Sequence, residues 1–162
     1  MSGRRSISGD QFRHTLSHLV TGVTVVTVRD PAGRPFGITV SAACALSLDP
    51  PMMLACIAHE ALLHELIVTA EALGVNVLAD GQADIARRFA DKGSHHFSDP
   101  QPDSSPAGLP LIPGALAHID LRRESVLRGG DHSIVTGVVE WARTRDGAPL
   151  CYFRTAYSSA AT

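Results

Sequence analysis

Cysteine is scarce in this sequence, and neither sign of charge dominates it. The three cysteines are Cys44, Cys56 and Cys151, and no two of them form a CxxC pair. An odd, unpatterned set argues against a disulfide framework and predicts a reducing, cytoplasmic location. The net charge of −2 provides no basic field. We therefore expect neither nucleic acid nor a membrane as a partner, and any anion must be held by local groups.

Long hydrophobic runs are also missing. The N-terminal MSGRRSISGD is polar and lacks the apolar region of a secretory signal, and no apolar run approaches the length of a bilayer span. The chain has 162 residues, of which 44% are hydrophobic and 19% are charged. This balance predicts one globular domain over residues 9–162, preceded by a flexible polar leader over residues 1–8.

Several motifs that would identify a chemistry are absent. No GxGxxG follows a predicted strand, and there is no P-loop and no GxSxG. His14 and His18 fall one turn apart on a predicted helix, but neither an acidic nor a thiol neighbour accompanies them, so we expect solvent-facing helix residues. His95 and His96 would point to opposite sides of an extended segment. We therefore expect no metal site.

Hydrophobic periodicity predicts the elements of secondary structure. Helical spacing covers residues 11–20, 61–70 and a segment after Asp80, which is the expected N-cap. Predicted strands cover residues 23–28, 35–41, 52–57, 73–78, 116–127, 131–141 and 149–153. Residues 92–110 are rich in Gly, Ser, Pro and Asp, which indicates a long loop. The pattern predicts an α+β domain built on a β-barrel.

The predicted strand over residues 35–41 has one face of small and hydroxyl-bearing side chains. Gly37, Thr39 and Ser41 share this face because strand side chains alternate. A flat tricyclic ring could approach such a backbone closely, and the hydroxyls and peptide groups could bond its polar edge. An ordinary edge strand facing solvent would have the same composition.

A second segment places a histidine at the start of a strand. Gly129-Gly130-Asp131 gives a tight entry, and His132 then opens the strand, where its ring can be held over a neighbouring pocket. A purely structural histidine would fit this position equally well.

The order of these segments resembles the flavin reductase family, short flavoproteins that serve two-component monooxygenases. The resemblance runs from Phe12 to Tyr157, nearly the whole chain. Its motifs lie at residues 21–27 (TGVTVVT), 37–51 (ending in SLDPP), 74–90, 130–138 (beginning with GDH) and 149–154 (PLCYFR). The resemblance implies a mainly β, split β-barrel of the FMN-binding flavin reductase type with a few peripheral helices.

The same resemblance implies an activity. It points to an NAD(P)H-dependent flavin reductase that transfers hydride from NADH or NADPH to FMN or FAD and supplies reduced flavin to a partner monooxygenase. It also implies a homodimer with each flavin near the subunit interface. Two alternatives remain: a split-barrel flavoprotein with tightly held flavin that acts as an oxidase or oxygenase, and a non-catalytic flavin-binding module.

The resemblance also assigns site residues by position. His132 matches the histidine that the family places near the nicotinamide, and Tyr157 would help to close that side. The residues expected along the flavin ring, or close to it on the paired strand, are Thr39, Val40, Ser41, Ala42, Thr21 and Val23. Those expected at its ribityl, phosphate or adenylate end are Ser47, Asn76, Phe89, Ala90 and Lys92.

Three departures from the family pattern bear on the flavin. Residues 41–43 read Ser-Ala-Ala where the family has SSF, which removes one side-chain hydrogen bond and one aromatic contact. Residues 93–97 read GSHHF in place of a DRF-like element, and Gly74 stands where an aromatic residue is common. The choice between FMN and FAD therefore stays open.

Overall fold

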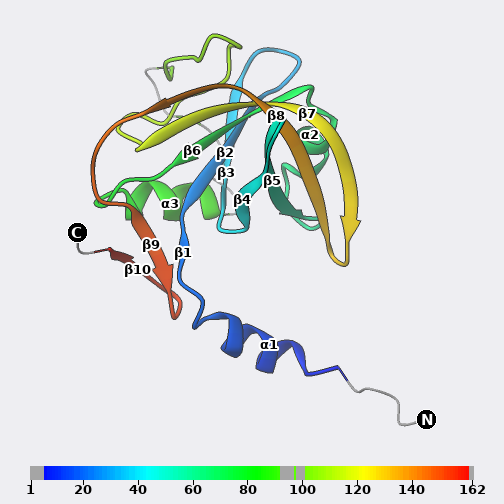
Figure 1. Ribbon diagram of the computed structural model, residues 1–162, viewed down its shortest axis with the longest axis vertical. Coiled ribbons are helices and arrows are strands. Elements are labelled where there is room, and N and C mark those ends of the chain that lie inside the picture. The colour runs from blue at the N-terminus through cyan, green and yellow to red at the C-terminus, as the bar shows by residue number, and fades with distance from the viewer. Residues whose placement is uncertain (1–5, 92–96, 98–100, 161–162) are drawn as a thin grey trace.

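The computed structural model describes residues 6–91, 97 and 101–160, which form a mainly β fold (Figure 1). The helices of this part of the chain are α1 (Gly9–Leu16), α2 (His64–Thr69) and α3 (Ala83–Ala90). Its strands are β1 (Thr21–Gly22), β2 (Thr24–Arg29), β3 (Pro35–Val40), β4 (Ala43–Leu48), β5 (Pro51–Ala58), β6 (Ala72–Val77), β7 (Ala117–Gly129), β8 (His132–Thr144), β9 (Leu150–Phe153) and β10 (Ala156–Ser159).

The strands form two antiparallel sheets. The larger sheet has the order β3-β2-β6-β7-β8-β5-β4, and the smaller has the order β1-β9-β10. β3 and β4 follow each other in the chain yet form the two edges of the larger sheet, so hydrogen bonds do not close it into a complete barrel. This is the mainly β, split architecture that the sequence predicts. In Figure 1, α1 projects away from the sheets, beyond β1.

The core has two parts, one on each face of β2. Val26 and Val28 point into a cluster with Ile57, Ile67 and Leu73. Side chains of the opposite face pack behind the sheet against α3, and this second cluster contains Val23, Val25, Leu78, Ala86, Phe89, Ile112, Ala115 and Leu150. Because β2 is covered on both faces, its sequence TVVTVR is an uninterrupted β-branched run as far as Val28 rather than an alternating one.

The predicted hairpin over residues 23–41 is confirmed as β2 and β3. Asp30 opens the turn, and its Oδ1 accepts hydrogen bonds from the backbone N–H of Ala32 at 2.9 Å and of Arg34 at 2.8 Å. Gly33 has φ of 79°, a left-handed conformation that glycine adopts without strain. The Asp and Gly of the turn therefore have the roles that their positions indicate.

Helix ends differ from the prediction. α1 begins earlier than expected because Ser8 and Gln11 form a reciprocal capping box, and it ends at Leu16. The expected N-cap Asp80 is wrong: the N-cap of α3 is Gln82, and Asp80 instead accepts from the N–H of Gly81. Of the expected leader, residues 1–5 lie outside the described residues, as do His95 and His96 of the expected loop.

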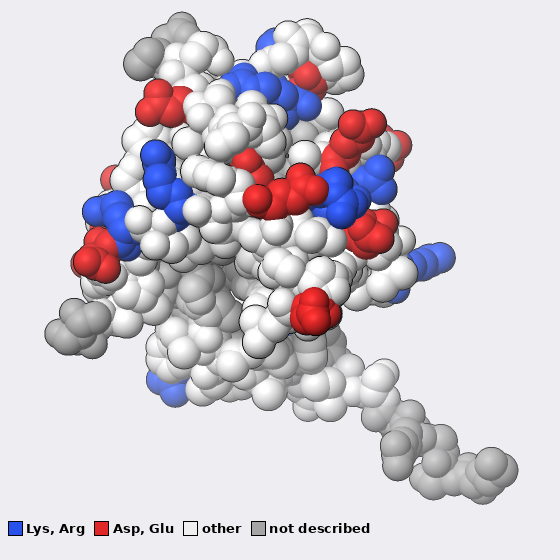
Figure 2. Space-filling model, turned by 45° about the horizontal axis from the view of Figure 1, so that its top comes forward, with Lys and Arg blue, Asp and Glu red and all other residues white. Residues whose placement is uncertain are grey.

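Charges of both signs are interspersed over the upper part of the face in Figure 2, whereas the region around the central hollow is mostly uncharged. This matches the small net charge and the absence of a single-sign field. Within residues 6–91, 97 and 101–160, no helix has the length and apolar character needed to cross a bilayer.

Candidate functional site

The end of β3 and its connection to β4 form a pinned backbone segment, residues 39–42, which we call the floor. The Oγ1 of Thr39 donates to the carbonyl of Ala86 in α3 at 2.7 Å. The Oγ1 of Thr24 donates to the carbonyl of Val40 at 2.6 Å, and the carbonyl of Ala42 accepts from the N–H of Cys56 at 2.9 Å. Two strands and a helix thus fix the backbone that the sequence proposes as a ring-binding face.

An open pocket of about 170 Å³ lies on one side of the floor. We call it the histidine pocket. His132 lies directly opposite Ala58 in the β5–β8 ladder, and both line this pocket. Small side chains keep the space open, and the full lining is Ile38, Thr39, Val40, Ser41, Ala42, Cys56, Ile57, Ala58, Ala61 and His132.

The β7–β8 turn orients His132. Gly130 has φ of 69° in the two-residue turn that ends at Asp131. The Nδ1 of His132 lies 2.7 Å from Oδ1 of Asp131. An ionised carboxylate only accepts hydrogen bonds, so Nδ1 carries the proton and Nε2 is the nitrogen left for a ligand. The same hydrogen bond holds the pKa of the Asp131 carboxyl below its usual value.

Two further histidines stand beside this turn. The Nε2 of His64 lies 2.9 Å from the Oγ of Ser133, and the rings of His59 and His64 meet edge to face with centroids 5.1 Å apart. The N–H of His59 donates to the carbonyl of Asp131 at 2.9 Å. The His59 bond fixes the backbone at Asp131, and the His64 contact fixes the side chain of Ser133 on the other side of His132. Sequence spacing gave no signal for them, because they depend on the packing of α2 against β8.

A second pocket, of about 190 Å³, also borders the floor and is lined by Val23, Thr39, Ser41, Tyr152 and Tyr157. We call it the tyrosine pocket. Tyr152 and Tyr157 are paired across β9 and β10, with ring centroids 5.2 Å apart. The guanidinium of Arg87 lies over the Tyr157 ring at 5.3 Å. Burial and Tyr152 raise the pKa of Tyr157 while Arg87 opposes this, so the phenol keeps its proton at neutral pH.

A flavin ring fits the floor by shape and by hydrogen-bonding capacity. The two pockets share Thr39 and Ser41, so a flat ring on the floor would have both open spaces next to it. The Oγ1 of Thr21, which pairs with Tyr152, is buried without a hydrogen-bond partner among the described residues. Buried polar atoms normally have partners, so this orphaned hydroxyl is available to a bound molecule.

Seven of the expected site residues line the two pockets: Val23, Thr39, Val40, Ser41, Ala42, His132 and Tyr157. Thr21 lies next to them on β1. The sequence missed Tyr152, Cys56, Ala58, Ala61 and Arg87. Tyr152 had a signal in the PLCYFR segment, whereas the others become neighbours only through contacts between elements that are separate in the sequence.

Asn76 is not brought to the floor. It is 1% exposed, and its Oδ1 accepts from the N–H of Ile112 at 2.9 Å and from Nδ1 of His118 at 2.8 Å. Its amide donates to the carbonyl of Val25 at 3.1 Å. The side chain is thus committed to the protein interior, under the segment that precedes β7. The sequence could not show this, because strand register decides which face Asn76 occupies.

The other expected phosphate-end residues also lie outside both pockets. Phe89 is 2% exposed and belongs to the core, where a Cβ on Gly37 would touch its ring at 3.0 Å. Ser47 is half-buried at a bulge in β4, and Ala90 is exposed at the end of α3. Lys92 lies outside the described residues.

A buried polar group beside Asn76 belongs to neither pocket. His118 is 6% exposed, and burial, reinforced by Arg143 and Arg145, lowers its pKa, with Asp120 opposing.

Elsewhere, burial and the neighbouring Cys44 raise the pKa of the Cys56 thiol. In the part of the chain that the structure describes, no group of three or more His, Cys, Asp or Glu side chains could hold a metal ion.

Curated relatives resemble this chain over most of their length. FMN reductase (NADH) SmoA of Agrobacterium fabrum is 39% identical over 141 residues, which cover 87% of this chain and 80% of the relative. The reductase subunit HsaB of a flavin-dependent monooxygenase from Rhodococcus jostii is 36% identical, with coverage of 94% and 78%.

Solved structures show the same fold. The Streptomyces globisporus NADH:FAD oxidoreductase SgcE6, in complex with NAD and FAD fragments, superposes with a TM-score of 0.88 at 30% identity and covers 97% of both chains. The flavin reductase PheA2 superposes with a TM-score of 0.87 at 28% identity, covering 96% of this chain and all of that one. The family model described as "Flavin reductase like domain" matches residues 16–161. With nearly the whole chain matched, the protein belongs to the flavin reductase-like family.

Proposed function

We propose that this chain is a flavin reductase that oxidises NADH, reduces FMN or FAD, and supplies the reduced flavin to a partner monooxygenase. One observation carries the proposal: His132, oriented by Asp131, faces the pinned floor from across a pocket lined by small side chains. Such a site can hold two flat rings against each other at reacting distance, which is the protein's main task in hydride transfer between cofactors.

The residues of the chain then act by binding and orientation. Bound flavin supplies the electron-accepting chemistry, and the backbone of the floor, Ser41 and the hydroxyl of Thr21 would hold its ring. The free Nε2 of His132 would accept a hydrogen bond from the carboxamide of the nicotinamide, so His132 need not donate a proton. Tyr152 and Tyr157, whose rings are tilted 57° to each other, would cover the side of the tyrosine pocket and exclude water.

NADH is the proposed donor because similar proteins are named for it, as in FMN reductase (NADH) SmoA and the NADH:FAD oxidoreductase SgcE6. These names also divide between FMN and FAD, so both flavins enter the assay. The partner follows from relatives such as the reductase subunit HsaB of a flavin-dependent monooxygenase.

We further infer a homodimer from unpartnered apolar side chains. On α1, Phe12 and Leu16 are 54% and 42% exposed and lie one turn apart, and Leu19, in the segment after the helix, is 60% exposed. On edge strand β4, Leu46 and Leu48 are 48% and 92% exposed. Exposed large apolar side chains at these two places favour an interface, and we infer that its partner is a second copy of the chain.

Anaerobic reduction of FMN by NADH, followed by flavin absorbance, tests the role of His132. His132→Ala should slow reduction or raise the KM for NADH by about 10-fold, because the nicotinamide loses a fixed partner. His132→Asn, which retains a side-chain acceptor, should restore part of the rate. Unchanged kinetics in His132→Ala would assign this histidine a structural role.

The dimer is tested by light scattering coupled to gel filtration. The variants Phe12→Ser and Leu48→Lys should shift the protein toward the monomer mass while the split barrel stays folded by circular dichroism. Leu62→Lys alters an equally exposed leucine outside these surfaces and should leave the mass unchanged. Monomeric wild-type protein at micromolar concentration would contradict the homodimer.

A further inference from the structure

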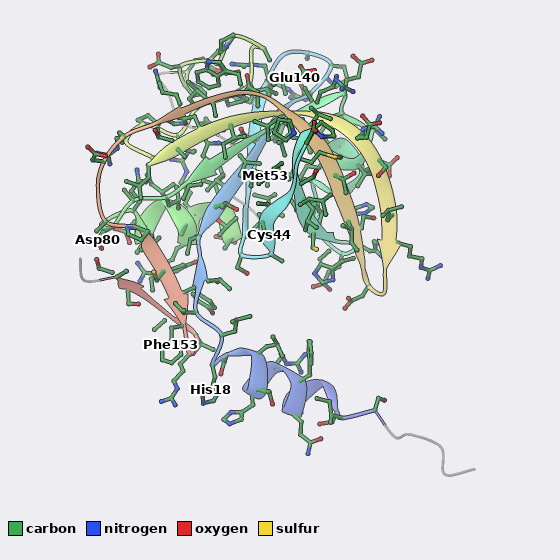
Figure 3. The ribbon with its side chains drawn as sticks, in the orientation of Figure 1. His18, Cys44, Met53, Asp80, Glu140 and Phe153 are labelled. Carbon is green, nitrogen blue, oxygen red and sulfur yellow. The ribbon has the colours of Figure 1, made fainter. Side chains whose placement is uncertain are left out.

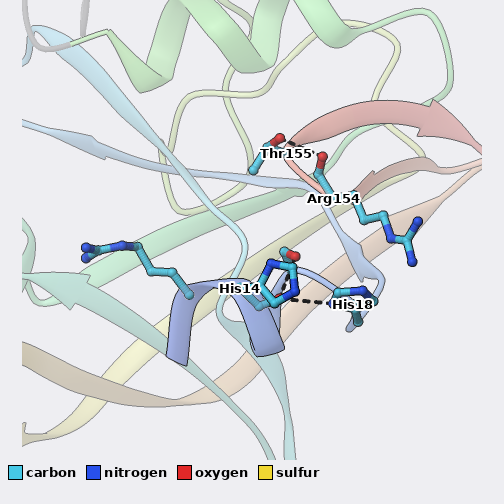
Figure 4. Close-up of a pocket in the computed structure, with 6 residues that line it drawn as sticks. His14, His18, Arg154 and Thr155 are labelled. Carbon is cyan, nitrogen blue, oxygen red and sulfur yellow. Dashed lines mark hydrogen bonds between the residues drawn. The ribbon is translucent and has the colours of Figure 1, made fainter. Parts of the chain in front are cut away.

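A third pocket, separate from the floor, lies between α1 and the β9–β10 turn (Figure 4). Its volume is about 520 Å³, larger than either pocket beside the floor. We call it the basic pocket, and its lining is Arg13, His14, Ser17, His18, Arg154 and Thr155. None of these residues has a role in the proposed hydride transfer.

Hydrogen bonds and ring contacts hold the two sides of the basic pocket together. The N–H of Arg154 donates to the carbonyl of Ser17 at 2.9 Å, which ties the turn to the end of α1. The Nδ1 of His18 lies 3.0 Å from the carbonyl of His14, and their rings are 5.2 Å apart. Figure 3 shows His18 beside Phe153, with ring centroids 6.5 Å apart. The pocket is therefore built from fixed elements rather than from a loose surface.

Every titratable side chain in this lining is basic. Arg13 pairs with Asp10, but Arg154 forms no ion pair in the described part of the chain, and its guanidinium rests over the Phe153 ring at 5.3 Å. The lining therefore contains a guanidinium, that of Arg154, without an ion pair among the described residues, in a chain whose net charge is −2. Such a pocket attracts anions.

The conformation of the β9–β10 turn supplies a second, independent observation. Arg154 and Thr155 form the whole two-residue loop and have φ of 47° and 64°. Left-handed φ at both positions is the requirement of a type I′ turn, in which Asn-Gly is strongly preferred. A β-branched threonine is strained there, and its hydroxyl reaches only the carbonyl of Arg154. Non-glycine residues that keep a strained backbone conformation, where glycine would fit better, point to a function for their side chains.

The basic pocket also stays accessible in the inferred homodimer. On the helical wheel, His14 and Ser17 project away from the apolar side of α1 that carries Phe12 and Leu16, and Arg13 lies at its flank. A second copy that covers the apolar side would therefore leave the basic side open.

We propose that the basic pocket binds the phosphate groups of a nucleotide, with Arg154 as the main charged contact. Guanidinium groups pair with phosphate oxygens through two parallel hydrogen bonds, and the imidazoles and Arg13 add donors. NADH and the phosphorylated flavins share this chemistry. The identity of the nucleotide rests on the proposed function, whereas phosphate binding itself does not.

Direct binding separates the site from the enzyme's activity. Isothermal titration with inorganic pyrophosphate and with ADP, neither of which carries hydride or flavin, should show binding that weakens with added salt. The double variant Arg154→Asn/Thr155→Gly should reduce the affinity by about 10-fold. The same variant should unfold at a temperature about 2–4 °C higher, because Asn-Gly relieves the strained turn. Arg128→Asn, which removes another exposed arginine, should change neither the affinity for pyrophosphate and ADP nor the unfolding temperature.

Steady-state kinetics with the double variant identify the source of the phosphate. A raised KM for FMN with an unchanged KM for riboflavin assigns the pocket to the flavin phosphate. A raised KM for NADH with either flavin assigns it to the nicotinamide coenzyme. No binding of pyrophosphate or ADP by the wild-type protein would overturn the proposal, even if the protein reduces flavin. An effect of the double variant only on transfer of electrons to an oxygenase would also overturn it, in favour of a protein-docking surface.

Discussion

The Oδ1 of Asp131 and the Nδ1 of His132 lie 2.7 Å apart at the turn that leads into β8. The contact joins neighbouring residues, yet it determines which imidazole nitrogen faces the histidine pocket. The carbonyl of Asp131 is held by the N–H of His59, and the side chain of Ser133 is held by His64. The orientation of His132 therefore depends on Asp131, and its position depends on the β5–β8 ladder.

Asp131→Asn tests this orientation. An asparagine can present either an acceptor or a donor to Nδ1, so the preference for one imidazole tautomer weakens. We expect the KM for NADH to rise by about 3- to 10-fold with a smaller change in kcat, in a steady-state assay with saturating flavin. Asp146→Asn, in the turn before β9, is the matched control and should behave as wild type. Equal kinetics in both variants would show that Asp131 does not position the histidine.

Ala58→Leu tests whether the histidine pocket is the place of reaction. Ala58 lies opposite His132, and a leucine there would fill much of the pocket of about 170 Å³. We expect flavin-dependent NADH oxidation to fall by more than about 10-fold with the fold retained, because a misplaced ring loses its alignment. Ala72→Leu, at a half-buried alanine outside both floor pockets, is the control. Full activity in Ala58→Leu would show that the reaction does not take place in the histidine pocket.

The stability of the fold should fall in acid partly through His118. Burial lowers the pKa of His118 below its ordinary value of 6.5, so below that pH the unfolded chain takes up a proton that the folded chain refuses. The contribution of His118 to the free energy of unfolding is therefore fully present above the ordinary pKa, and it declines as the pH falls toward the pKa in the folded chain. Urea unfolding at about pH 7.5 and about pH 5.5 should show a smaller acid loss in His118→Gln. An identical loss would assign the acid sensitivity to other groups.

Gly74→Ala tests the packing of the sheet under the segment that precedes β7. A Cβ at Gly74 would lie 2.3 Å from the Oγ1 of Thr27, which is fixed by donating to the carbonyl of Pro110 at 2.8 Å. We expect a loss of about 2–3 kcal/mol in the free energy of unfolding, measured with urea. Gly22→Ala meets nothing within 4 Å and should change stability by less than about 1 kcal/mol. The close contact also gives a physical reason why an aromatic side chain is absent at residue 74.

The sequence predicts most of this fold because most of its strands have β-branched or alternating residues bounded by turn residues. The β2–β3 hairpin follows from a β-branched run, an Asp-Pro-Ala-Gly turn and a return strand. β4 was not predicted, since ACALSL has small residues and no clear alternation, and most of its side chains are exposed. β10 is short and polar, and pairing with β9 defines it.

The floor could be predicted from the sequence, but the positions of the side chains expected at the phosphate end of a flavin could not. Thr39 and Ser41 lie where alternation along one strand puts them. Asn76 illustrates the opposite case, because register with Val25 turns its side chain into a buried network. Contacts between separate elements also create the Tyr152–Tyr157 ring pair across β9 and β10 and the approach of Arg87 from α3. Sequence reasoning therefore locates what one strand supplies and misses what two or three elements supply together.

The most direct test of the central claim is NADH oxidation by the purified protein with FMN, FAD or riboflavin added in turn, followed by nicotinamide absorbance. A flavin reductase should oxidise NADH rapidly only when flavin is added. The rate should saturate as the flavin concentration rises, and it should fall in His132→Ala. Absence of oxidation with every flavin, by a folded protein, would contradict the proposed reductase activity.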